Sequence, residues 1–135
     1  MLSNGASRRL SRVKSKDTKP EVAVCDIVRK LGARCRVQDS NLPGKPDLVF
    51  RRRKKIIFVH GCFWHRHRDC SRTQTPASRT SYWIPKFART VARDRQALRK
   101  LRRAGWSVLV VWECELARPD SVARKIAAFL SGQRI

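Results

Sequence analysis

The pattern of apolar and polar positions along the chain predicts alternating helices and strands. In three segments apolar residues recur every three or four positions, which places them on one face of a helix. Four shorter apolar runs, rich in β-branched residues, are typical of strands. The predicted elements are a helix from the 18–21 capping box to Gly32, strands at 34–39, 45–50 and 55–60, a helix at 85–104, a strand at 107–113, and a helix capped by Asp120 or Ser121. This order, α-β-β-β-α-β-α, predicts an α/β protein with a mixed central sheet flanked by helices.

The segment at 56–70, IIFVHGCFWHRHRDC, has the greatest density of candidate functional residues. It contains all three histidines of the chain, two of its five cysteines, and the neighbouring aromatic residues Phe63 and Trp64. The apolar run at its start predicts a buried strand that brings these side chains to one end of the sheet. The predicted loop at 61–80 is long for a small domain, and such loops are usually functional or held by an additional interaction. A bound metal ion would hold this one.

The charge of the chain narrows the choice of partner. Its 135 residues include 32 Lys and Arg but 10 Asp and Glu, giving a net charge of +22 that favours a polyanion. We predict a single domain, residues 1–135, that binds nucleic acid. Residues 1–16 predict a basic arm that is disordered in the free protein and follows phosphates on DNA. The arm's candidate DNA contacts are Arg8, Arg9, Arg12 and Lys14.

The apolar segments also bear on where the protein works. None is long enough to span a bilayer, and the first residues lack the apolar core of a signal peptide, so we expect a cytoplasmic protein with no membrane partner. In that reducing compartment, five cysteines favour metal ligands and buried thiols over disulfides.

Asp47 and His60 are predicted to lie close together at one end of the sheet. A hairpin turn at 51–54 would pair Phe50 with Lys55, which makes Asp47 and His60 diagonal neighbours on one face. A carboxylate and an imidazole so placed could hold a divalent cation and a phosphate, as phosphodiester hydrolysis requires. Taken alone, Asp47 is typical of a turn and His60 of a hydrogen-bonded buried histidine. Together, in so basic a chain, they favour catalysis.

Two further carboxylates are candidates for the same site. Asp94 lies on the apolar stripe of the helix predicted at 85–104, where an unpaired carboxylate would be costly. It could orient a histidine or hold a metal-bound water, and the alternative is a buried ion pair with an arginine. Glu21 already has a structural role in the predicted helix cap, so the pattern alone assigns it no catalytic role.

A second group combines three cysteines with a histidine: Cys62, His67, Cys70 and Cys114. Zinc prefers thiolate and imidazole ligands in a tetrahedron, and a Cys₃His set leaves no open position, so this metal would be structural. Three of these residues lie in the 61–80 loop and the fourth follows the 107–113 strand, so zinc would attach the loop to the sheet. His65 or Asp69 could replace His67, and the alternative interpretation is three plain thiols.

Three aromatic residues, Phe63, Trp64 and Trp83, lie in or beside the polar loop. They could form a small core for the loop. They could equally act as wedges that stack on bases and separate a base step.

These residues lie in motifs that resemble those of the very short patch repair (Vsr) mismatch endonucleases. The likeness extends from about residue 7 to residue 114 with nearly matching spacings. The motifs are LPGKPD at 42–47, FVHGCFWHRH at 58–67, RTSYW at 79–83, RDR at 93–95, GW at 105–106 and VLVVWEC at 108–114. The resemblance implies a restriction-endonuclease-like core, and the predicted order of elements agrees with it.

The resemblance also implies an activity. Members of the family use Mg²⁺ to cut one strand of double-stranded DNA 5′ of the thymine in a T:G mismatch, the product of 5-methylcytosine deamination. By position, Asp47 corresponds to a metal-binding aspartate and His65 to the general base. Asp94 corresponds to the residue that orients a histidine. His60 corresponds to a second active-site histidine near the scissile phosphate. Glu21 corresponds to an acidic residue near the active site.

The remaining correspondences concern zinc, DNA and the magnesium ligands. The structural zinc ligands correspond to Cys62, His67, Cys70 and Cys114. The residues that open DNA at the mismatch correspond to Phe63, Trp64 and Trp83. Val59 stands where the family has a metal-coordinating threonine, and it remains compatible with Mg²⁺ because the family uses the backbone carbonyl there. Two residues separate His67 from Cys70, where a family member has one.

The resemblance favours a monomeric bacterial enzyme associated with the nucleoid. Two other functions fit the same residues. One is a less selective mismatch or DNA nickase of the same fold. The other is a non-catalytic zinc-containing DNA-binding protein, which would not need Asp47, His60, His65 and Asp94 to converge.

Overall fold

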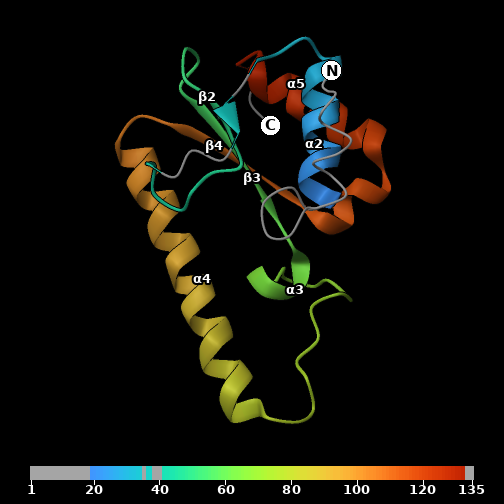
Figure 1. The fold of residues 1–135 in the computed structure, drawn as a ribbon, viewed down its shortest axis with the longest axis vertical. Coiled ribbons are helices and arrows are strands. Elements are labelled where there is room, and N and C mark those ends of the chain that lie inside the picture. Colours follow the sequence, from blue (N-terminus) through green and yellow to red (C-terminus); the bar gives the residue numbers. More distant parts are fainter. Residues whose placement is uncertain (1–18, 35, 38–40, 133–135) are drawn as a thin grey trace, which may run out of the picture.

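The computed structural model describes residues 19–34, 36–37 and 41–132, which form the elements labelled in Figure 1. These are α2 (Lys19–Lys30), β1 (Arg36–Val37), β2 (Leu48–Phe50), β3 (Lys55–His60), α3 (Cys62–His65), α4 (Thr80–Arg103), β4 (Ser107–Trp112), the 3₁₀ helix η1 (Glu113–Ala117) and α5 (Pro119–Leu130). The predicted basic arm at 1–16 lies outside the described residues, with Arg8, Arg9, Arg12 and Lys14. So does Thr18, the first residue of the predicted capping box.

The four strands form one mixed sheet in the order β1-β2-β3-β4. Strands β1, β2 and β3 pair antiparallel, whereas β4 lies parallel to β3. The register places Phe50 opposite Lys55, which is the pairing predicted for a turn at 51–54. In the parallel pair, His60 lies beside Trp112. The carboxyl ends of β3 and β4 therefore meet at one edge of the sheet.

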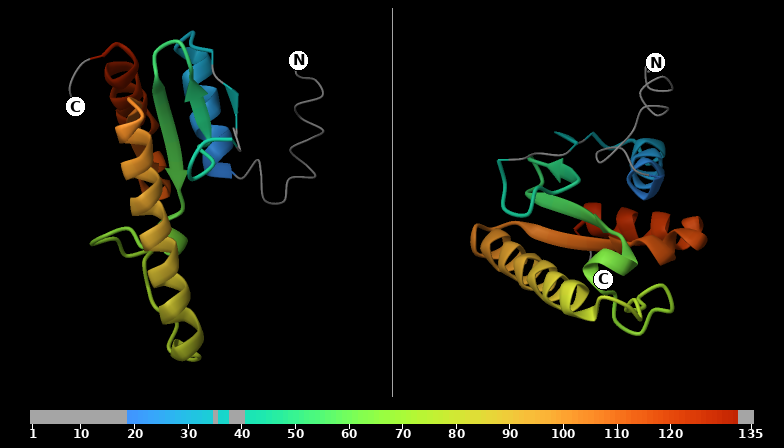
Figure 2. Two further views of the ribbon diagram at one scale, coloured as in Figure 1. Left: turned by 90° about the vertical axis from the view of Figure 1, so that its left-hand side faces the viewer. Right: turned by 60° about the horizontal axis from the view of Figure 1, so that its bottom comes forward.

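Helices cover both faces of the sheet, because successive strand residues point to opposite sides. On one face, Val24 of α2 and Ile126 of α5 belong to the same core as Ile57 of β3. On the other face, Leu101 of α4 packs with Ile56. Figure 2 shows the sheet lying between α4 and the pair formed by α2 and α5. Burial on both faces explains why the central strands are almost continuously apolar.

Helix α4 begins at Thr80, earlier than the predicted start at Pro85, which lies inside the helix. Proline favours a first helical turn because it lacks the N–H that an interior position would use, and this preference misplaced the predicted start. Contacts within α4 and with α3 stabilise the additional turn, because the Trp83 ring also lies 5.8 Å from that of Trp64 in α3. The N–H of Trp83 donates to the carbonyl of Arg79 at 3.1 Å, and the Trp83 ring stacks on Phe87 at 5.7 Å between centroids.

Strand β2 is shorter than the predicted strand at 45–50. It starts at Leu48, because Gly44 and Lys45 have φ values of +76° and +50°, which no strand accommodates. Gly44 is required here for a second reason. A Cβ at this position would lie 2.8 Å from the Cβ of Ala97, so glycine lets the loop before β2 approach α4 closely.

The C-terminal boundaries also differ from the prediction. Strand β4 ends at Trp112, and η1 follows it directly. Helix α5 starts with Pro119 at its first position and Arg118 as N-cap, so neither Asp120 nor Ser121 caps it. Pro119 favours a helix start, because the first helical position does not use the N–H that proline lacks. The prediction had not used this signal.

Candidate functional site

A cleft of about 220 Å³ lies at the carboxyl end of β3, between α2 and α4. It brings together all five residues predicted to be catalytic: Glu21, Asp47, His60, His65 and Asp94. The remaining lining is Gly44, Lys45, Phe58, Val59, Ala97 and Leu98. Glu21 comes from α2, Asp94 from α4 and the two histidines from β3 and α3, so the fold assembles the cleft from four separate elements.

Asp47 immediately precedes β2, and its carboxylate turns toward β3. Its Oδ2 accepts a hydrogen bond from the backbone N–H of Val59 at 2.6 Å. The pKa of Asp47 is raised to about 7, chiefly by burial and further by the hydrogen-bonded carboxyl of Glu21, although the Val59 bond opposes the shift. Two half-buried carboxyl groups in one cleft favour either a shared proton or a bound cation.

The two histidines of the cleft stack on each other, and a carboxylate orients one of them. The rings of His60 and His65 lie 3.9 Å apart at 5° to each other, and His65 Nδ1 is 2.7 Å from Asp94 Oδ2. Helix α3 makes this stack possible, because its single turn starts after Gly61 and brings His65 back over His60. The bond to Asp94 leaves Nε2 of His65 as the nitrogen able to exchange a proton.

His60 differs from His65 in its surroundings. Its side chain is buried, and its Nδ1 has no hydrogen-bond partner among the described residues. Burial, followed by the neighbouring His65, lowers the pKa of His60 to about 4, so this imidazole is neutral at pH 7.

The nitrogen and oxygen atoms of His60, His65 and Asp94 lie within 4.8 Å of one another, close enough to hold a metal ion. The hydrogen bond between His65 and Asp94 already accounts for the closeness of that pair. Two imidazoles would suit a transition metal better than Mg²⁺, which prefers oxygen. We therefore interpret His65 and Asp94 as a hydrogen-bonded pair rather than as a second cation site.

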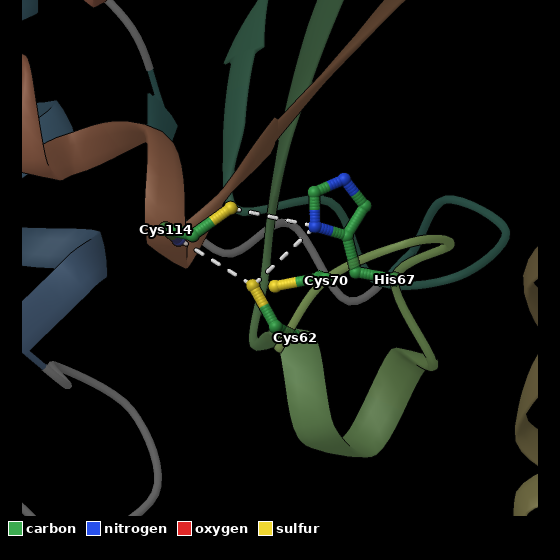
Figure 3. A group of neighbouring side chains, drawn as sticks. All are labelled: Cys62, His67, Cys70 and Cys114. Carbon is green, nitrogen blue, oxygen red and sulfur yellow. Dashed lines mark hydrogen bonds between the residues drawn. The ribbon is translucent and has the colours of Figure 1, made fainter. Parts of the chain in front are cut away.

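A second cluster contains Cys62, His67, Cys70 and Cys114, whose ligand atoms lie within 4.8 Å of one another. Figure 3 shows these side chains pointing toward a common centre. His67 Nδ1 is 3.6 Å from the sulfur of Cys62 and 3.4 Å from that of Cys114. The structure places His67 in this cluster and His65 in the cleft, while Asp69 is exposed. Of the three candidates for the fourth ligand, His67 therefore lies with the cysteines, whereas His65 and Asp69 do not.

The chemistry of this cluster fits a metal ion. Burial raises the pKa of the Cys62 thiol to about 12, whereas the backbone N–H of Arg72 lowers that of Cys70. A divalent cation would hold all three sulfurs as thiolates, since a coordinating thiol is deprotonated. A tetrahedral site requires four donors of this kind around one point.

Trp112, which the sequence pattern did not single out, connects the two clusters. Its indole stacks on His67 at 4.1 Å and 10°, and it meets His60 edge-on at 5.1 Å. The available signal was its position, at the carboxyl end of an apolar strand and two residues before a candidate ligand, Cys114. Trp112 therefore lies between the cysteine cluster and His60 of the cleft.

The three predicted aromatic residues form one cluster with Phe87. Phe63 meets Trp64 at 5.1 Å and Phe87 at 5.2 Å, while Trp83 stacks on Phe87. Arg66 lies over the Phe87 ring at 3.9 Å and donates to the carbonyl of Phe63 at 3.1 Å. Phe63 and Trp83 are partly buried, but 46% of Trp64 is exposed, so the cluster is both a loop core and an aromatic surface.

Comparison with known proteins agrees with this site. Residues 4–72 match the family model described as DNA mismatch endonuclease Vsr. The chain is 46% identical over 108 residues to the type II nicking enzyme V.XorIIP of Xanthomonas oryzae, covering 80% of this chain and 79% of that protein. It is 41% identical over 110 residues to the DNA mismatch endonuclease Vsr of Escherichia coli, covering 82% and 70%. V.NaeI of Lentzea aerocolonigenes is 41% identical over 127 residues, covering 90% and 75%.

These matches, with a cleft of carboxylates and histidines in a very basic α/β protein, define the class: the protein is a DNA endonuclease. More narrowly, the chain belongs to the Vsr DNA mismatch endonuclease family. Within the described ranges, no helix has the length and apolar character that crossing a membrane requires.

Proposed function

We propose that this endonuclease cuts one strand of DNA at a T:G mismatch, 5′ of the thymine, in a reaction that depends on Mg²⁺. The observation that carries the proposal is the convergence of Asp47 with the His65–Asp94 pair in one cleft. A DNA-binding protein without catalysis would not require that convergence. The family membership supplies the substrate class, and the E. coli relative is named for mismatch cleavage.

His65 is suited to act as the general base. Asp94 holds its Nδ1 at 2.7 Å, so the carboxylate fixes the tautomer, and Nε2 is left to take a proton from water. Asp94 also stabilises the imidazolium that this proton transfer forms. His60 is neutral and packed against His65, so it positions the base and lies near the phosphate without adding charge.

The donors of the cleft fit Mg²⁺, a hard cation that prefers carboxylate and carbonyl oxygens. Asp47 would hold it, with the backbone carbonyl of Val59 as a second ligand. The raised pKa of Asp47 beside Glu21 supports this assignment, because a cation relieves the repulsion between two neighbouring, half-buried carboxylates. When bound, the ion would polarise the scissile phosphate and stabilise charge in the transition state.

The cysteine cluster fits structural zinc, with Cys62, His67, Cys70 and Cys114 as ligands. The mixed sheet with helices on both faces is compatible with a restriction-endonuclease-like core in a single domain, residues 1–135. We propose that the protein acts as a monomer in the bacterial cytoplasm, where chromosomal DNA is available.

The rate of nicking on different duplexes tests the specificity. With Mg²⁺, we expect a T:G duplex to be nicked far faster than the matched T:A duplex and faster than other mismatches in the same flanking sequence. Equal rates on all mismatches would instead favour a less selective nickase. Binding without product under any divalent metal would favour a non-catalytic DNA-binding protein.

The protonation of Asp47 should make Mg²⁺ binding depend on pH. Because the pKa is raised to about 7, the carboxyl is protonated below that value and must lose a proton to bind the ion. The apparent Mg²⁺ affinity should fall by about tenfold per pH unit below 7 and level off above it. Mg²⁺ titrations of single-turnover nicking at several pH values measure this dependence. An affinity that does not change between pH 6 and 7 would contradict the assignment of Asp47.

The exposed ring of Trp64 should contribute to mismatch binding. Base stacking on an aromatic side chain contributes about 1–3 kcal/mol, so Trp64→Ala should weaken T:G binding by roughly tenfold to a hundredfold. Fluorescence anisotropy with T:G and matched duplexes measures the effect. Leu31→Ala is the control, since Leu31 is similarly exposed, at 41% against 46%, but lies beyond the end of α2. If Trp64→Ala lowers affinity for both duplexes equally, Trp64 is not a mismatch wedge.

A further inference from the structure

A second basic surface lies at the end of β3 opposite to the catalytic cleft. It is a groove of about 570 Å³ between the β2–β3 turn and the segment that follows α2. Its basic lining consists of Arg34, Arg51, Arg52 and Arg53, and its floor includes Val49 and Phe50. In Figure 1 the β2–β3 turn and α3 lie at opposite ends of β3. The five steps from Lys55 to His60 correspond to about 17 Å of strand.

The turn that carries these arginines is held rigidly by the helices beside it. Arg53 donates to the carbonyl of Leu130 at the end of α5, at 3.2 Å. Lys54 donates to the carbonyl of Ala104, just after α4, at 3.3 Å, and lies 4.5 Å from the centre of the Trp106 ring. Arg53 and Lys54 therefore donate hydrogen bonds to carbonyl groups at the C-terminal ends of α5 and α4. The turn that carries Arg51 and Arg52 is thereby attached to the ends of α5 and α4.

Among the described residues, no carboxylate pairs with Arg34 or Arg52 of the groove. None of the described residues that line it is acidic. Arg34 and Arg52 are exposed, and neither forms an ion pair with a described residue. The carbonyls of Val28 and Arg29 near the end of α2 accept hydrogen bonds from the N–H groups of Ala33 and Gly32. Guanidinium groups arranged without counter-charges favour phosphate, which they bind in a bidentate manner.

We propose that this groove binds the phosphodiester backbone of a second DNA segment while the catalytic cleft holds the mismatch. Arg34 and Arg52 come from two chain segments that line one concave surface, so the groove presents guanidinium donors to neighbouring phosphates. A phosphate seated at the cleft cannot also contact these donors, because the length of β3 separates the two sites. The second contact would hold the enzyme on bulk DNA near a lesion. It does not depend on which mismatch the cleft prefers.

The test is binding of a second duplex to protein whose catalytic cleft is already loaded. Full-length protein is saturated with an unlabelled short T:G duplex without added divalent metal, and a labelled matched duplex is then titrated by anisotropy. Wild type should bind it with an affinity that depends steeply on salt. Arg34→Glu with Arg52→Glu should weaken this binding by about tenfold or more and reduce the salt slope by about 2. Single-turnover nicking of the short T:G duplex should be unchanged.

The matched control reverses two exposed arginines at the start and middle of α5, Arg118→Glu with Arg124→Glu, which changes the net charge equally. If both double variants lose affinity for the second duplex equally, the groove is not a DNA-binding site. If wild type binds only one duplex, the proposal is wrong. If tripolyphosphate binds the loaded protein but the labelled matched duplex does not, the ligand of the groove is a free polyphosphate. That result would overturn the DNA assignment.

A second measurement needs no variant and so does not depend on the variants folding. Arginine-specific modification of wild-type protein, read by mass spectrometry, should show Arg34 and Arg52 protected when the second duplex is added, with Arg118 and Arg124 still reactive. Equal reactivity of Arg34 and Arg52 with and without the second duplex would contradict the proposal.

Discussion

Asp47→Asn should slow single-turnover nicking of a T:G duplex by about a thousandfold, the largest loss we expect from one side chain at this site. Asparagine keeps an oxygen that accepts the Val59 N–H, so the hairpin should fold as before. It removes the negative charge that would bind Mg²⁺ and so weakens charge stabilisation in the transition state. Rates are measured with saturating enzyme over a range of Mg²⁺ concentrations.

Asp26→Asn is the control for this substitution. Asp26 is an exposed aspartate on α2 whose partner is Arg29 at 3.3 Å, so it lies outside the cleft while belonging to a lining helix. We expect it to nick at the wild-type rate. An Asp47→Asn protein that nicks as fast as the Asp26→Asn protein would show that the active site lies elsewhere.

Cys62→Ser should remove zinc and destabilise the protein. Cys62 is fully buried within the cluster, and loss of one of four ligands leaves an incomplete tetrahedron. Wild type should contain about one zinc per chain and the variant almost none. The loss should cost roughly 3 kcal/mol or more, lowering the melting temperature by roughly 10 °C. Elemental analysis and thermal unfolding measure both effects, and a strong chelator should reproduce them in wild type.

Cys25→Ser provides the matched control, since Cys25 is a partly buried cysteine outside the cluster. It should retain zinc, with at most a small loss of stability. Folded wild-type protein containing less than about a tenth of one zinc per chain would exclude the structural metal. Because Trp64 and His65 lie between Cys62 and His67, loss of zinc should also disorder the aromatic surface and the base, and nicking should fall with zinc content.

The parts of the site that follow from local rules were predictable from the sequence. A four-residue turn fixes the register of a hairpin, so the pairing of Phe50 with Lys55 and the closeness of Asp47 to β3 could be derived without a structure. Helical spacing similarly placed Asp94 on the inner face of α4. Ligand chemistry selected the cysteine cluster, although spacing left its fourth member open.

Features that depend on tertiary contacts could not be predicted in this way. Local preference set the predicted start of α4 at Pro85, whereas the earlier turn packs Trp83 against Phe63 and Trp64 of α3. The stack of Trp112 on His67 depends on β4 lying parallel to β3 and on the path of the loop. Glu21 had a plausible local role as a helix cap, so the pattern alone did not place it beside Asp47; the family resemblance placed it near the site, and the structure gives it a hydrogen bond to Asp47.

Mapping the cut on each strand of a T:G duplex tests the central claim most directly. The duplex is labelled separately on each strand, incubated with the enzyme and Mg²⁺ or with EDTA, and the products are sized at single-nucleotide resolution. We expect one Mg²⁺-dependent product, from the thymine strand, ending at the phosphodiester 5′ of the mismatched thymine. Cleavage of both strands, cleavage elsewhere, or equal cleavage in EDTA would contradict it.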